Sequence, residues 1–492
     1  MVENGTLMQY FEQNISGDGK LWKNLTLDAT KLKNAGVTSV WLPPAFKGVD
    51  GAKDAGFTPY DLYDLGEFRQ KGSARTKYGT KKEYVEAVSA LKDKGIGTYA
   101  DMVFDCKCGA DDIEDVPAAE FNRSSTYQMV GEDKTIGGVT RFTFPGRKGK
   151  YSDFIWCWKH FKGIDWDQKK VVEDLVKNPE VSEKIKTALS KYDYIMGADI
   201  DFSKEEVLQE FVRWAIWYVN TVGISGVSLT SAEKVPAEFF RSFLYQLRQV
   251  MEPVEKSEDD DEQKVFAMGE CWMEDVNALS GYLGSLHQEA SLLDIPLHKN
   301  LFYAAQAKGA YDLRRIFDGT LVARDPMHAI TFVDCHLTQP GGAHESWVED
   351  WFKSLAYSLI LLRRDGYPCV FYGDYKGIPQ DKYKGDKAML DKLMKLRKQK
   401  AYGEQHDYFD DPDCIGWTRE GDAEHKDSGL AVILSDGKGG TKRMYIGRQF
   451  AGAHFSDVMG NAKYNIKIDD DGCGEFYVNR GAVAVWVRRE SK

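Results

Sequence analysis

The stretch "SKEEVLQEFVRWAIWYVNTVGISGVSLT", residues 203–230, contains two hydrophobic patterns in direct succession. In its first part apolar side chains favour one side of a helix, at Val207, Phe211, Trp214, Ile216 and Tyr218. This spacing predicts an amphipathic helix over residues 203–223. The remaining residues, 224–230, form a short run of apolar and small residues that predicts a strand. A helix followed at once by a strand is the repeating unit of α/β folds.

The same alternation extends along much of the chain. Seven more short runs rich in β-branched or aromatic residues predict strands: "LMQYF" (7–11), "TSVWLPP" (38–44), "GTYADMVF" (97–104), "VFAMGE" (265–270), "SLLDIP" (291–296), "AITFVDC" (329–335) and "YPCVFYG" (367–373). Helix-like segments such as 81–95 separate most of them. Together with residues 224–230 these runs make eight strands, which predicts an α/β fold of the (β/α)8 TIM-barrel type.

Two parts of the chain depart from this alternation. Residues 105–200 are too long for a simple crossover and are rich in turn-forming and aromatic residues, so we expect an inserted lobe there. After residue 398 the pattern changes to short strands with tight turns, which predicts an antiparallel β domain over 399–492. The barrel itself is therefore expected to consist of residues 1–104 and 201–398.

The composition excludes several classes of protein. The chain has 492 residues, of which 42% are hydrophobic and 29% charged, as is usual for a globular protein. Its net charge of −11 argues against a nucleic-acid partner, which requires a basic surface. No apolar run approaches about 18 residues, so no insertion into a membrane is expected. The first residues lack the basic and apolar regions of a secretory signal.

The cysteines indicate a reducing compartment. Eight cysteines are scattered along the chain without the regular spacing of a disulfide framework. We therefore expect free thiols and a cytoplasmic location. Cys106 and Cys108 form a Cys-x-Cys pair, but no second Cys or His pair follows at the spacing of a zinc site, so a metal site is not predicted from this pair.

Seven segments carry a motif pattern that spans nearly the whole chain. They are "NGTLMQYFE" (4–12), "VWLPPAFKG" (40–48), "PYDLYDLGEFRQKGSARTKYGTKKEY" (59–84), "FPGRKGKYSDF" (144–154), "YDYIMGADID" (192–201), "FVDCHLTQP" (332–340) and "WTREGD" (417–422). In these segments the chain resembles the bacterial liquefying α-amylases of glycoside hydrolase family 13. The resemblance implies a catalytic barrel, a B lobe inserted after the third strand and a C-terminal β-sandwich.

The resemblance also implies the position of an active site, but the residues there are altered. The family's motif at the fourth strand runs Gly-Phe-Arg-Leu-Asp-Ala-Val-Lys-His, whereas this chain reads "GVSLTSAEK" over 226–234. Thr230 stands in place of the nucleophilic Asp, and Ser228 in place of the Arg that orients it. Glu233 and Lys234 stand in place of a sugar-binding Lys and His. The motif therefore lacks the nucleophile of a retaining glycosidase.

The seventh strand is altered in a similar way. The family's Asn-His-Asp reads Cys335-His336-Leu337 here, so Leu337 stands in place of the Asp that supports the transition state. His336 stays at the position of a substrate-binding His. Glu270, in "MGECW", stays at the position of the general acid. Two of the three carboxylates implied by the family are thus replaced.

Further changes concern sugar contacts. The third strand ends in Asp105 and Cys106 where the family has Asn-His. Gln13 replaces an aromatic platform residue, and Phe57 replaces a stacking Tyr. Because loss of one covalent nucleophile costs about a millionfold in kcat in proteases, we expect the chain to lack glycosidase activity. Cys106 and Cys335 are expected to face the former active site.

Three functional readings follow from these positions. The first is a non-catalytic module that binds a protein partner or has a structural role. The second is an active α-glucan hydrolase with rearranged chemistry, in which Glu233 approaches and pairs with Glu270 at the wider spacing of inverting enzymes. The third is a non-catalytic protein that binds α-glucans through outlying subsites. Reducing-sugar release and glucan binding distinguish these readings.

The resemblance also implies a calcium site between the B lobe and the barrel. Its ligands would come from four positions: Asp105, Asp193, Asp199 and the backbone carbonyl of Lys234. Three carboxylates and a carbonyl suit a hard cation that prefers oxygen. At two further positions of the family's metal cluster the chain has Lys162 and Ser203 in place of Asp. One calcium ion is therefore expected at most.

Overall fold

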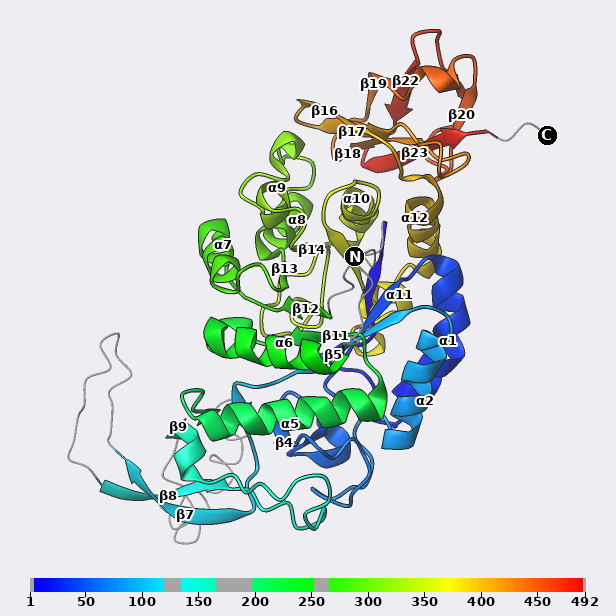
Figure 1. The fold of residues 1–492 in the computed structure, drawn as a ribbon. Helices are drawn as coiled ribbons and strands as arrows, with labels where there is room; N and C mark the ends of the chain where they lie inside the picture. Colours follow the sequence, from blue (N-terminus) through cyan, green and yellow to red (C-terminus); the bar gives the residue numbers. More distant parts are fainter. Residues whose placement is uncertain (1–3, 119–133, 165–196, 252–264, 490–492) are drawn as a thin grey trace.

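The computed structural model describes residues 4–118, 134–164, 197–251 and 265–489 (Figure 1). Within these residues, eight parallel strands form a closed barrel in the order β1-β15-β14-β13-β12-β11-β5-β2. The barrel strands are β1 (Leu7–Gln9), β2 (Ser39–Leu42), β5 (Gly97–Met102), β11 (Gly226–Leu229), β12 (Phe266–Gly269), β13 (Ser291–Leu293), β14 (Ala329–Phe332) and β15 (Tyr367–Phe371). The fold is therefore a TIM barrel, as the sequence predicts.

Each of the eight predicted strands corresponds to one barrel strand, although the observed strands are shorter. The run 329–335, for example, contributes only β14, because the chain turns after the strand ends. In that turn the hydroxyl of Thr338 donates to the carboxylate of Asp334 at 2.9 Å, and the amide of Cys335 donates to the same hydroxyl at 2.9 Å. Side-chain bonds to the backbone thus replace strand pairing at this point.

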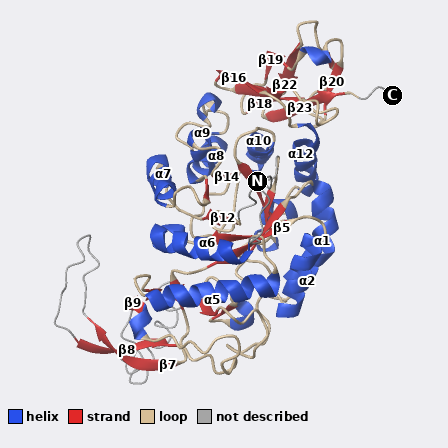
Figure 2. Cartoon of the chain, in the orientation of Figure 1, coloured by secondary structure: helices blue, strands red, loops and turns tan. Residues whose placement is uncertain are grey.

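Helices lie outside the strands of the barrel (Figure 2). They are α1 (Leu21–Ala35), α2 (Lys81–Lys92), α5 (Glu205–Val222), α6 (Ala237–Met251), α7 (Val276–Ser285), α8 (Ile295–Ala307), α9 (Leu321–Arg324), α10 (Asp350–Leu361), α11 (Tyr372–Lys376) and α12 (Lys387–Lys400). Helix α2 begins with a capping box between Thr80 and Glu83. Helix α5 is the amphipathic helix predicted over 203–223, and it ends where Gly223 adopts a φ of 77°.

The segment between β5 and β11 forms a lobe beside the barrel, at the lower left of Figure 1. It contains a three-stranded antiparallel sheet in the order β6 (Cys106–Lys107), β10 (Ala198–Ile200), β9 (Phe161–Ile164). A hairpin of β7 (Asp112–Ala118) and β8 (Lys134–Arg141) extends from it. A short ladder of β3 (Lys47–Gly48) and β4 (Pro59–Asp61) follows β2, and the backbone of Cys108 donates to Pro59 at 2.9 Å.

The C-terminal part is antiparallel. Its six-stranded sheet has the order β16-β17-β18-β23-β20-β21, and β19 pairs with β22. Their bounds are β16 (Gln405–Asp411), β17 (Cys414–Arg419), β18 (Leu430–Ser435), β19 (Gly440–Tyr445), β20 (His454–Asp457), β21 (Ile466–Lys467), β22 (Cys473–Val478) and β23 (Ala482–Arg488). Side chains from both sheets share one core, including Ile433, Met444, Phe476 and Trp486. The two layers therefore pack as a small sandwich.

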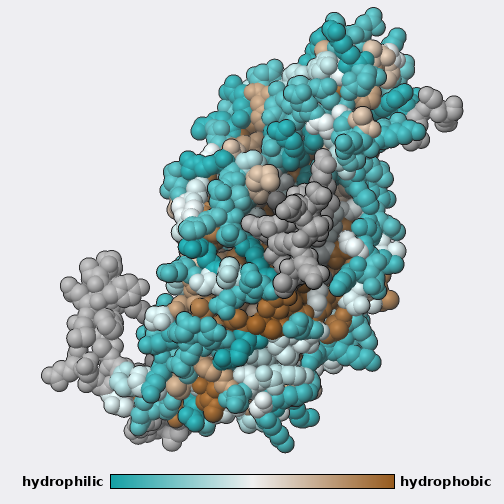
Figure 3. Space-filling model, viewed as in Figure 1, coloured by the Kyte–Doolittle hydropathy of each residue, from teal (hydrophilic) through white to brown (hydrophobic). Residues whose placement is uncertain are grey.

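The visible surface in Figure 3 is mostly hydrophilic, and apolar residues gather near helices α5 and α6. Large exposed apolar side chains are scattered over the described residues, with Tyr464 at 76% and Leu27 at 72% exposure among them. Among the helices that the structure describes, none combines the length and apolar character needed to cross a bilayer.

Candidate active site

The residues singled out from the sequence lie at the carboxyl ends of three barrel strands, of which β11 and β12 are neighbours and β14 is separated from β12 by β13. Thr230 follows β11, Glu270 follows β12, and His336 and Leu337 follow β14. This end of a TIM barrel is where catalytic residues usually lie. All four side chains are buried, with exposures of 5%, 0%, 1% and 9% in that order. The implied active site is therefore closed in this structure.

Thr230 makes a hydrogen bond to a residue that the sequence analysis did not identify. Its hydroxyl donates to Oδ1 of Asp101 on β5 at 2.6 Å. Asp101 is 1% exposed, and its other oxygen, Oδ2, is buried without a hydrogen-bond partner among the described residues. Burial raises the pKa of Asp101 to about 8. The position of the implied nucleophile is thus occupied by a hydroxyl that is engaged with a buried carboxyl group.

A charged residue within a run of apolar ones is the signal that would have identified Asp101. It lies in "GTYADMVF", where both neighbours, Ala100 and Met102, are buried. An acid at an interior strand position is rare unless it is paired or functional. In the β5–β11 register Asp101 lies level with Ser228, whose buried hydroxyl has no hydrogen-bond partner among the described residues. Asp101 and Ser228 therefore place neighbouring polar groups inside the barrel that are not fully hydrogen-bonded.

Glu270 is the most enclosed acid of the site. Both of its carboxyl oxygens are buried without hydrogen-bond partners in the described part of the chain. Burial raises the pKa of Glu270 well above its ordinary value, and the charges of Asp101 and Glu233 raise it further. Burial thus favours the protonated form of Glu270, which is the form that a general acid needs. However, the side chain has no exposure through which a leaving oxygen would reach it.

His336 lies 3.8 Å from Glu270, measured from Nδ1 to Oε1. Such a distance suits an ion pair, but burial lowers the pKa of His336 to about 3, so the ring is neutral. The side-chain amide of Gln9 donates to Nδ1 at 2.8 Å, which agrees with an unprotonated Nδ1. Phe57 stacks on the ring at 5.1 Å between centroids, and Phe11 lies at 5.0 Å. The predicted substrate-binding histidine is thus enclosed by aromatic side chains.

A buried network of charged side chains stabilises the loop that carries Leu337. Lys353 donates to Asp334 at 2.6 Å and to Asp374 at 2.5 Å. Burial raises the pKa of Asp334 to about 7. The amide of His344 donates to the carbonyl of Leu337 at 3.0 Å. The loop geometry is therefore fixed, although Leu337 itself supplies no charge.

The other residues predicted from the sequence lie either in the buried site or at the surface. Glu233 lies on a single 3₁₀ turn, Ala232–Lys234, and is exposed, so it is not placed beside the buried carboxyl group of Glu270. Cys335 is buried, and this burial raises the pKa of its thiol. The backbone amide of Gln13 donates to the side-chain oxygen of Gln339 at 3.0 Å. All eight cysteines are free thiols in the structure.

Three of the four predicted metal ligands surround one small pocket. Asp105, Asp199 and Lys234 line a cavity of about 50 Å³ where the lobe meets the barrel. Asp193 lies outside the described residues. The pocket is also lined by Thr230 and by further residues, among them Cys106, Cys108 and Phe57. The predicted metal position and the predicted active site therefore adjoin each other.

The donor set does not fit calcium well. The ammonium group of Lys234 lies 3.1 Å from Oδ2 of Asp105, so this carboxylate already has a positive partner. The desolvated Lys234 nevertheless has a raised pKa, because the charge of Asp105 and the bond to it outweigh the effect of burial. Two thiols, which are poor ligands for a hard cation, line the same pocket.

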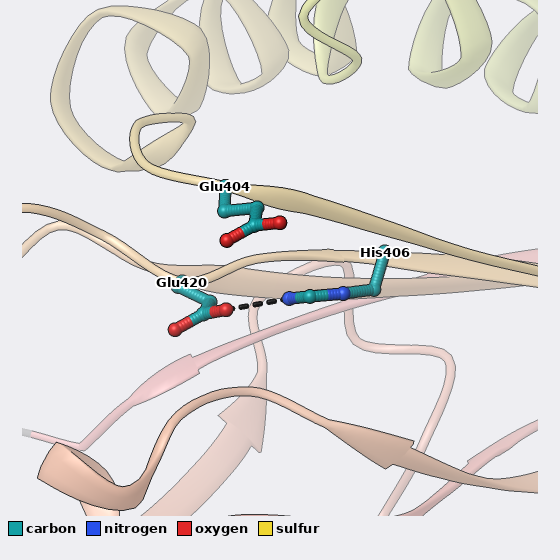
Figure 4. Close-up of side chains that lie close together, drawn as sticks. All are labelled: Glu404, His406 and Glu420. Atoms are coloured by element: carbon teal, nitrogen blue, oxygen red, sulfur yellow. Dashed lines mark hydrogen bonds and ion pairs between the residues drawn. The ribbon is translucent and has the colours of Figure 1, made fainter.

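A second group of metal-ligating side chains lies in the C-terminal sheet (Figure 4). Glu404, His406 and Glu420 each place one ligand atom within 4.8 Å of the others. Nε2 of His406 is 2.5 Å from the carboxylate of Glu420 and is engaged in that bond. The group is partly exposed. The hydrogen bond that joins β16 to the end of β17 therefore accounts for the closeness of His406 and Glu420.

Known proteins resemble the chain over its whole length. The family model "Alpha-amylase C-terminal" matches residues 430–487. The "Alpha-amylase" of Geobacillus stearothermophilus is 45% identical over 99% of this chain and 88% of its own. The "Cytoplasmic alpha-amylase" of Escherichia coli strain K12 is 36% identical over 99% of this chain and its full length.

A solved structure shares the fold at low sequence identity. It is an α-amylase from Geobacillus thermoleovorans in complex with acarbose, with a TM-score of 0.63. The match covers 99% of both chains at 14% identity. At this identity the likeness concerns the arrangement of barrel, lobe and C-terminal sheets. The likeness does not show which residues form an active site.

Proposed function

Because the chain belongs to the α-amylase family, glycoside hydrolase family 13, we propose that it is a member that has lost glycosidic cleavage and acts as a non-catalytic binding or structural module. The observation that carries this proposal is the hydrogen bond from Thr230 to the buried Asp101, next to a Glu270 that is fully enclosed. No group at this position is able to take up the glucosyl residue.

The chemistry of retaining cleavage explains why this observation matters. A carboxylate must attack the anomeric carbon while a second carboxyl group protonates the leaving oxygen. Threonine attacks only when a base removes its proton. Thr230 donates its proton to Asp101 in a hydrogen bond, but the raised pKa of Asp101 means that this acid is largely protonated near pH 7 and serves poorly as a base. Leu337 offers no anion to the developing positive charge.

The surroundings of Glu270 support the same proposal. A general acid must reach the glycosidic oxygen of a bound sugar. Glu270 is 0% exposed, and the ring of His336 between it and the aromatic residues is 1% exposed. Phe57 stacks on the ring of His336 and adds to the enclosure of the site. The carboxyl group of Glu270 is therefore withdrawn from solvent in this conformation.

An active hydrolase with rearranged chemistry is the second candidate from the sequence. It requires Glu233 and Glu270 to face one substrate from opposite sides, about 6.5–9.5 Å apart. Glu233 is exposed on its 3₁₀ turn, whereas Glu270 is enclosed. This difference in exposure favours the non-catalytic proposal. Binding of an α-glucan outside the closed pocket is a third candidate, for which the names of the amylase relatives are the support.

Two further proposals concern the surroundings of the protein. We propose a cytoplasmic location, which the eight free thiols support and which agrees with the name of the Escherichia coli relative. We also propose that calcium does not stabilise this chain. The support is the ion pair of Asp105 with Lys234, which places a positive charge where the cation would be.

The test is reducing-sugar release from starch and maltooligosaccharides by the purified full chain. We expect release to be undetectable, or lower by about a millionfold than that of an intact homologue. The Glu270→Gln variant is the control for trace activity of the preparation. Turnover that disappears in this variant would contradict the proposal and favour the second candidate. Binding to insoluble starch without turnover would instead favour the third.

A further inference from the structure

Three side chains that are able to bind a metal gather at one end of the C-terminal sheet. Glu404 directly precedes β16, His406 is the second residue of that strand, and Glu420 directly follows β17. One ligand atom of each lies within 4.8 Å of the others (Figure 4). Within the described residues, no other group of three histidine, cysteine or carboxylate side chains is as compact.

The pairing of β16 with β17 brings the three side chains to one face. Gln405 lies opposite Arg419, so Glu404 lies opposite Glu420, and the backbone amide of Glu420 donates to the carbonyl of Glu404 at 2.9 Å. Alternate residues of one strand share a face, and so do directly opposite residues of an antiparallel pair. Glu404, His406 and Glu420 therefore project from the same side of the sheet.

Two glycines keep the backbones of this strand pair close to each other. Gly403 and Gly421 flank the pair, and both have a positive φ, of 82° and 77°. A Cβ atom on Gly403 would lie 2.1 Å from the carbonyl oxygen of Gly421. A larger residue at this position would push the strands apart. The backbone therefore places Glu404 and Glu420 next to each other before any ligand binds.

Contacts outside the group orient two of its three members. The ring of His406 meets that of Tyr445 edge to face, with centroids 5.5 Å apart and an angle of 82° between the rings. The side-chain amide of Gln449 donates to the backbone carbonyl of Glu420 at 2.8 Å. The histidine ring and the backbone of this glutamate are thus fixed by neighbouring residues.

The hydrogen bond between His406 and Glu420 does not explain the position of Glu404. The carboxylate of Glu404 makes no bond to either residue, although it lies near both (Figure 4). In the described part of the chain Glu420 forms an ion pair with His406, and no ion pair involves Glu404. Two carboxylates of like charge repel each other at this range, so a cation between them would be favourable.

We propose that Glu404, His406 and Glu420 bind one divalent transition-metal cation, such as Zn²⁺, through one nitrogen and two oxygen atoms. An imidazole nitrogen suits zinc, whereas calcium takes six to eight oxygen ligands. Three protein ligands leave a fourth position for water. This site lies outside the barrel and does not depend on whether the chain cleaves glucans.

The hydrogen bond from His406 to Glu420 is compatible with the bound cation. Zinc–nitrogen and zinc–oxygen bonds of about 2.0–2.1 Å at a tetrahedral angle hold the two ligand atoms about 3.3 Å apart. Nε2 and the oxygen of Glu420 are now 2.5 Å apart, so they need to separate by less than about 1 Å. The side chain of Glu420 is 20% exposed and is free to make this shift. In the complex the neutral ring carries its hydrogen on Nδ1, and the lone pair of Nε2 faces the metal.

The position of the site indicates a structural role for the cation. Only residues 401–404 separate helix α12 of the barrel from β16. A metal held by Glu404, His406 and Glu420 joins the start of β16 to the end of β17. The cation would therefore tie together the two strands at the point where the chain passes from the barrel to the C-terminal sheets.

The experiment measures binding of Zn²⁺ to the metal-stripped full chain by calorimetry in an excess of Ca²⁺. We expect one equivalent to bind at this site, and Glu404→Gln to weaken its binding at least tenfold, because loss of a ligand costs more than the roughly 10–100-fold cost of outer-shell changes. Glu404→Gln leaves the bond between His406 and Glu420 in place, so it should fold like the parent. The exposed Glu424→Gln is the matched control and should bind like the parent.

A second measurement separates this site from the thiols, which also bind such cations. Co²⁺ replaces Zn²⁺ as the probe, because nitrogen and oxygen ligands give visible ligand-field bands without sulfur-to-cobalt charge transfer. We expect the parent to show visible bands that are absent from Glu404→Gln. Cobalt binding seen only through sulfur bands would overturn the proposal, as would equal Zn²⁺ affinity of the parent and Glu404→Gln.

A third measurement uses the unaltered chain. Zn²⁺ should protect His406 from modification by diethyl pyrocarbonate, as read by peptide mass spectrometry. His425 is the control, because it is paired with Asp422 in a similar way but has no second carboxylate in a metal-ligating group. Equal modification of His406 with and without Zn²⁺ would overturn the proposal.

Discussion

The hydroxyl of Thr230 donates a hydrogen bond of 2.6 Å to the carboxyl group of the buried Asp101. This bond joins two barrel strands, β11 and β5, at the level where the family's nucleophile would be. A donor is needed here because Asp101 is 1% exposed and its other oxygen has no hydrogen-bond partner among the described residues. Thr230 thus supplies a hydrogen-bond partner for the neighbouring acid.

Restoring the nucleophile alone should fail. In Thr230→Asp a second carboxyl group would face Asp101 in the same buried space, and the donated hydrogen bond would be lost. We expect no sugar release and a free energy of unfolding lower by about 1–3 kcal/mol. Urea denaturation at pH 7 measures the stability. Thr230→Ser, which keeps the hydroxyl, is the control and should retain most of it.

Recovery of activity should need several changes together. Thr230→Asp supplies a nucleophile, Leu337→Asp supplies the supporting anion, and Ser228→Arg supplies a cation between buried acids. The measurement is reducing-sugar release by this triple variant, compared with Thr230→Asp alone. Turnover by the single variant at a rate near that of the triple variant would contradict our account of the closed pocket.

Stability should fall as the pH rises from about 4 to 8. Burial raises the pKa of Asp101 to about 8 in the folded chain, from an unfolded value of about 3.9. Its protonated form therefore stabilises the fold fully below about pH 4, and this contribution is lost as the pH rises through about 8. The slope is on the order of 1 kcal/mol per pH unit.

Asp101→Asn tests this assignment. The amide cannot ionise, so the variant should be more stable than the parent at pH 8 and closer to it at pH 5. Urea midpoints at the two pH values give the comparison, and the exposed Asp470→Asn is the control. A parent and an Asp101→Asn variant with parallel pH profiles would show that Asp101 is not the group responsible.

The buried ammonium group of Lys353 should be essential for stability. It donates to Asp334 and Asp374, and its removal would leave two enclosed carboxyl groups without their cation. Lys353→Met should lower the free energy of unfolding by about 3–5 kcal/mol. The exposed Lys387→Met, which removes a pair with Asp391, should cost less than about 1 kcal/mol. Equal losses for the two variants in guanidinium denaturation would contradict this.

Removal of calcium should have little effect on the fold. A ligand that binds only the folded state raises the melting temperature with its concentration. Since Lys234 already neutralises Asp105, we expect EGTA to change Tm by less than about 2 °C. Differential scanning calorimetry with EGTA and with excess Ca²⁺ measures this. A large fall in Tm with EGTA, restored by Ca²⁺, would contradict the proposed absence of a stabilising calcium ion.

The fold could be predicted from the sequence because its signals are local. Each barrel strand is a short apolar run, and the helix over 203–223 has regular apolar spacing, so the alternation is visible without the structure. The ends of the strands could not be predicted as well. Strand β14 ends early because Thr338 and Asp334 bind the backbone of the following turn, a tertiary feature of a few side chains.

The candidate site could be predicted only in part. Motif positions located Thr230, Glu270 and Leu337 at the carboxyl ends of barrel strands. They did not indicate that the pocket is closed, nor that Phe57 stacks against His336, which is far from it in the sequence. Nor did they indicate the pairing of Lys234 with Asp105, which lie far apart in the sequence. Contacts of this kind depend on the assembled fold.

The pairing of β1 with β15 has a consequence for synthesis. Leu7 lies opposite Cys369, so the barrel closes only after the ribosome has released about three quarters of the chain. At about 5–20 residues per second, the first strand waits roughly 20–70 s for its second neighbour. During that time its apolar edge is open to other nascent chains. The edge of β1 that later pairs with β15 therefore stays without its partner until synthesis is well advanced.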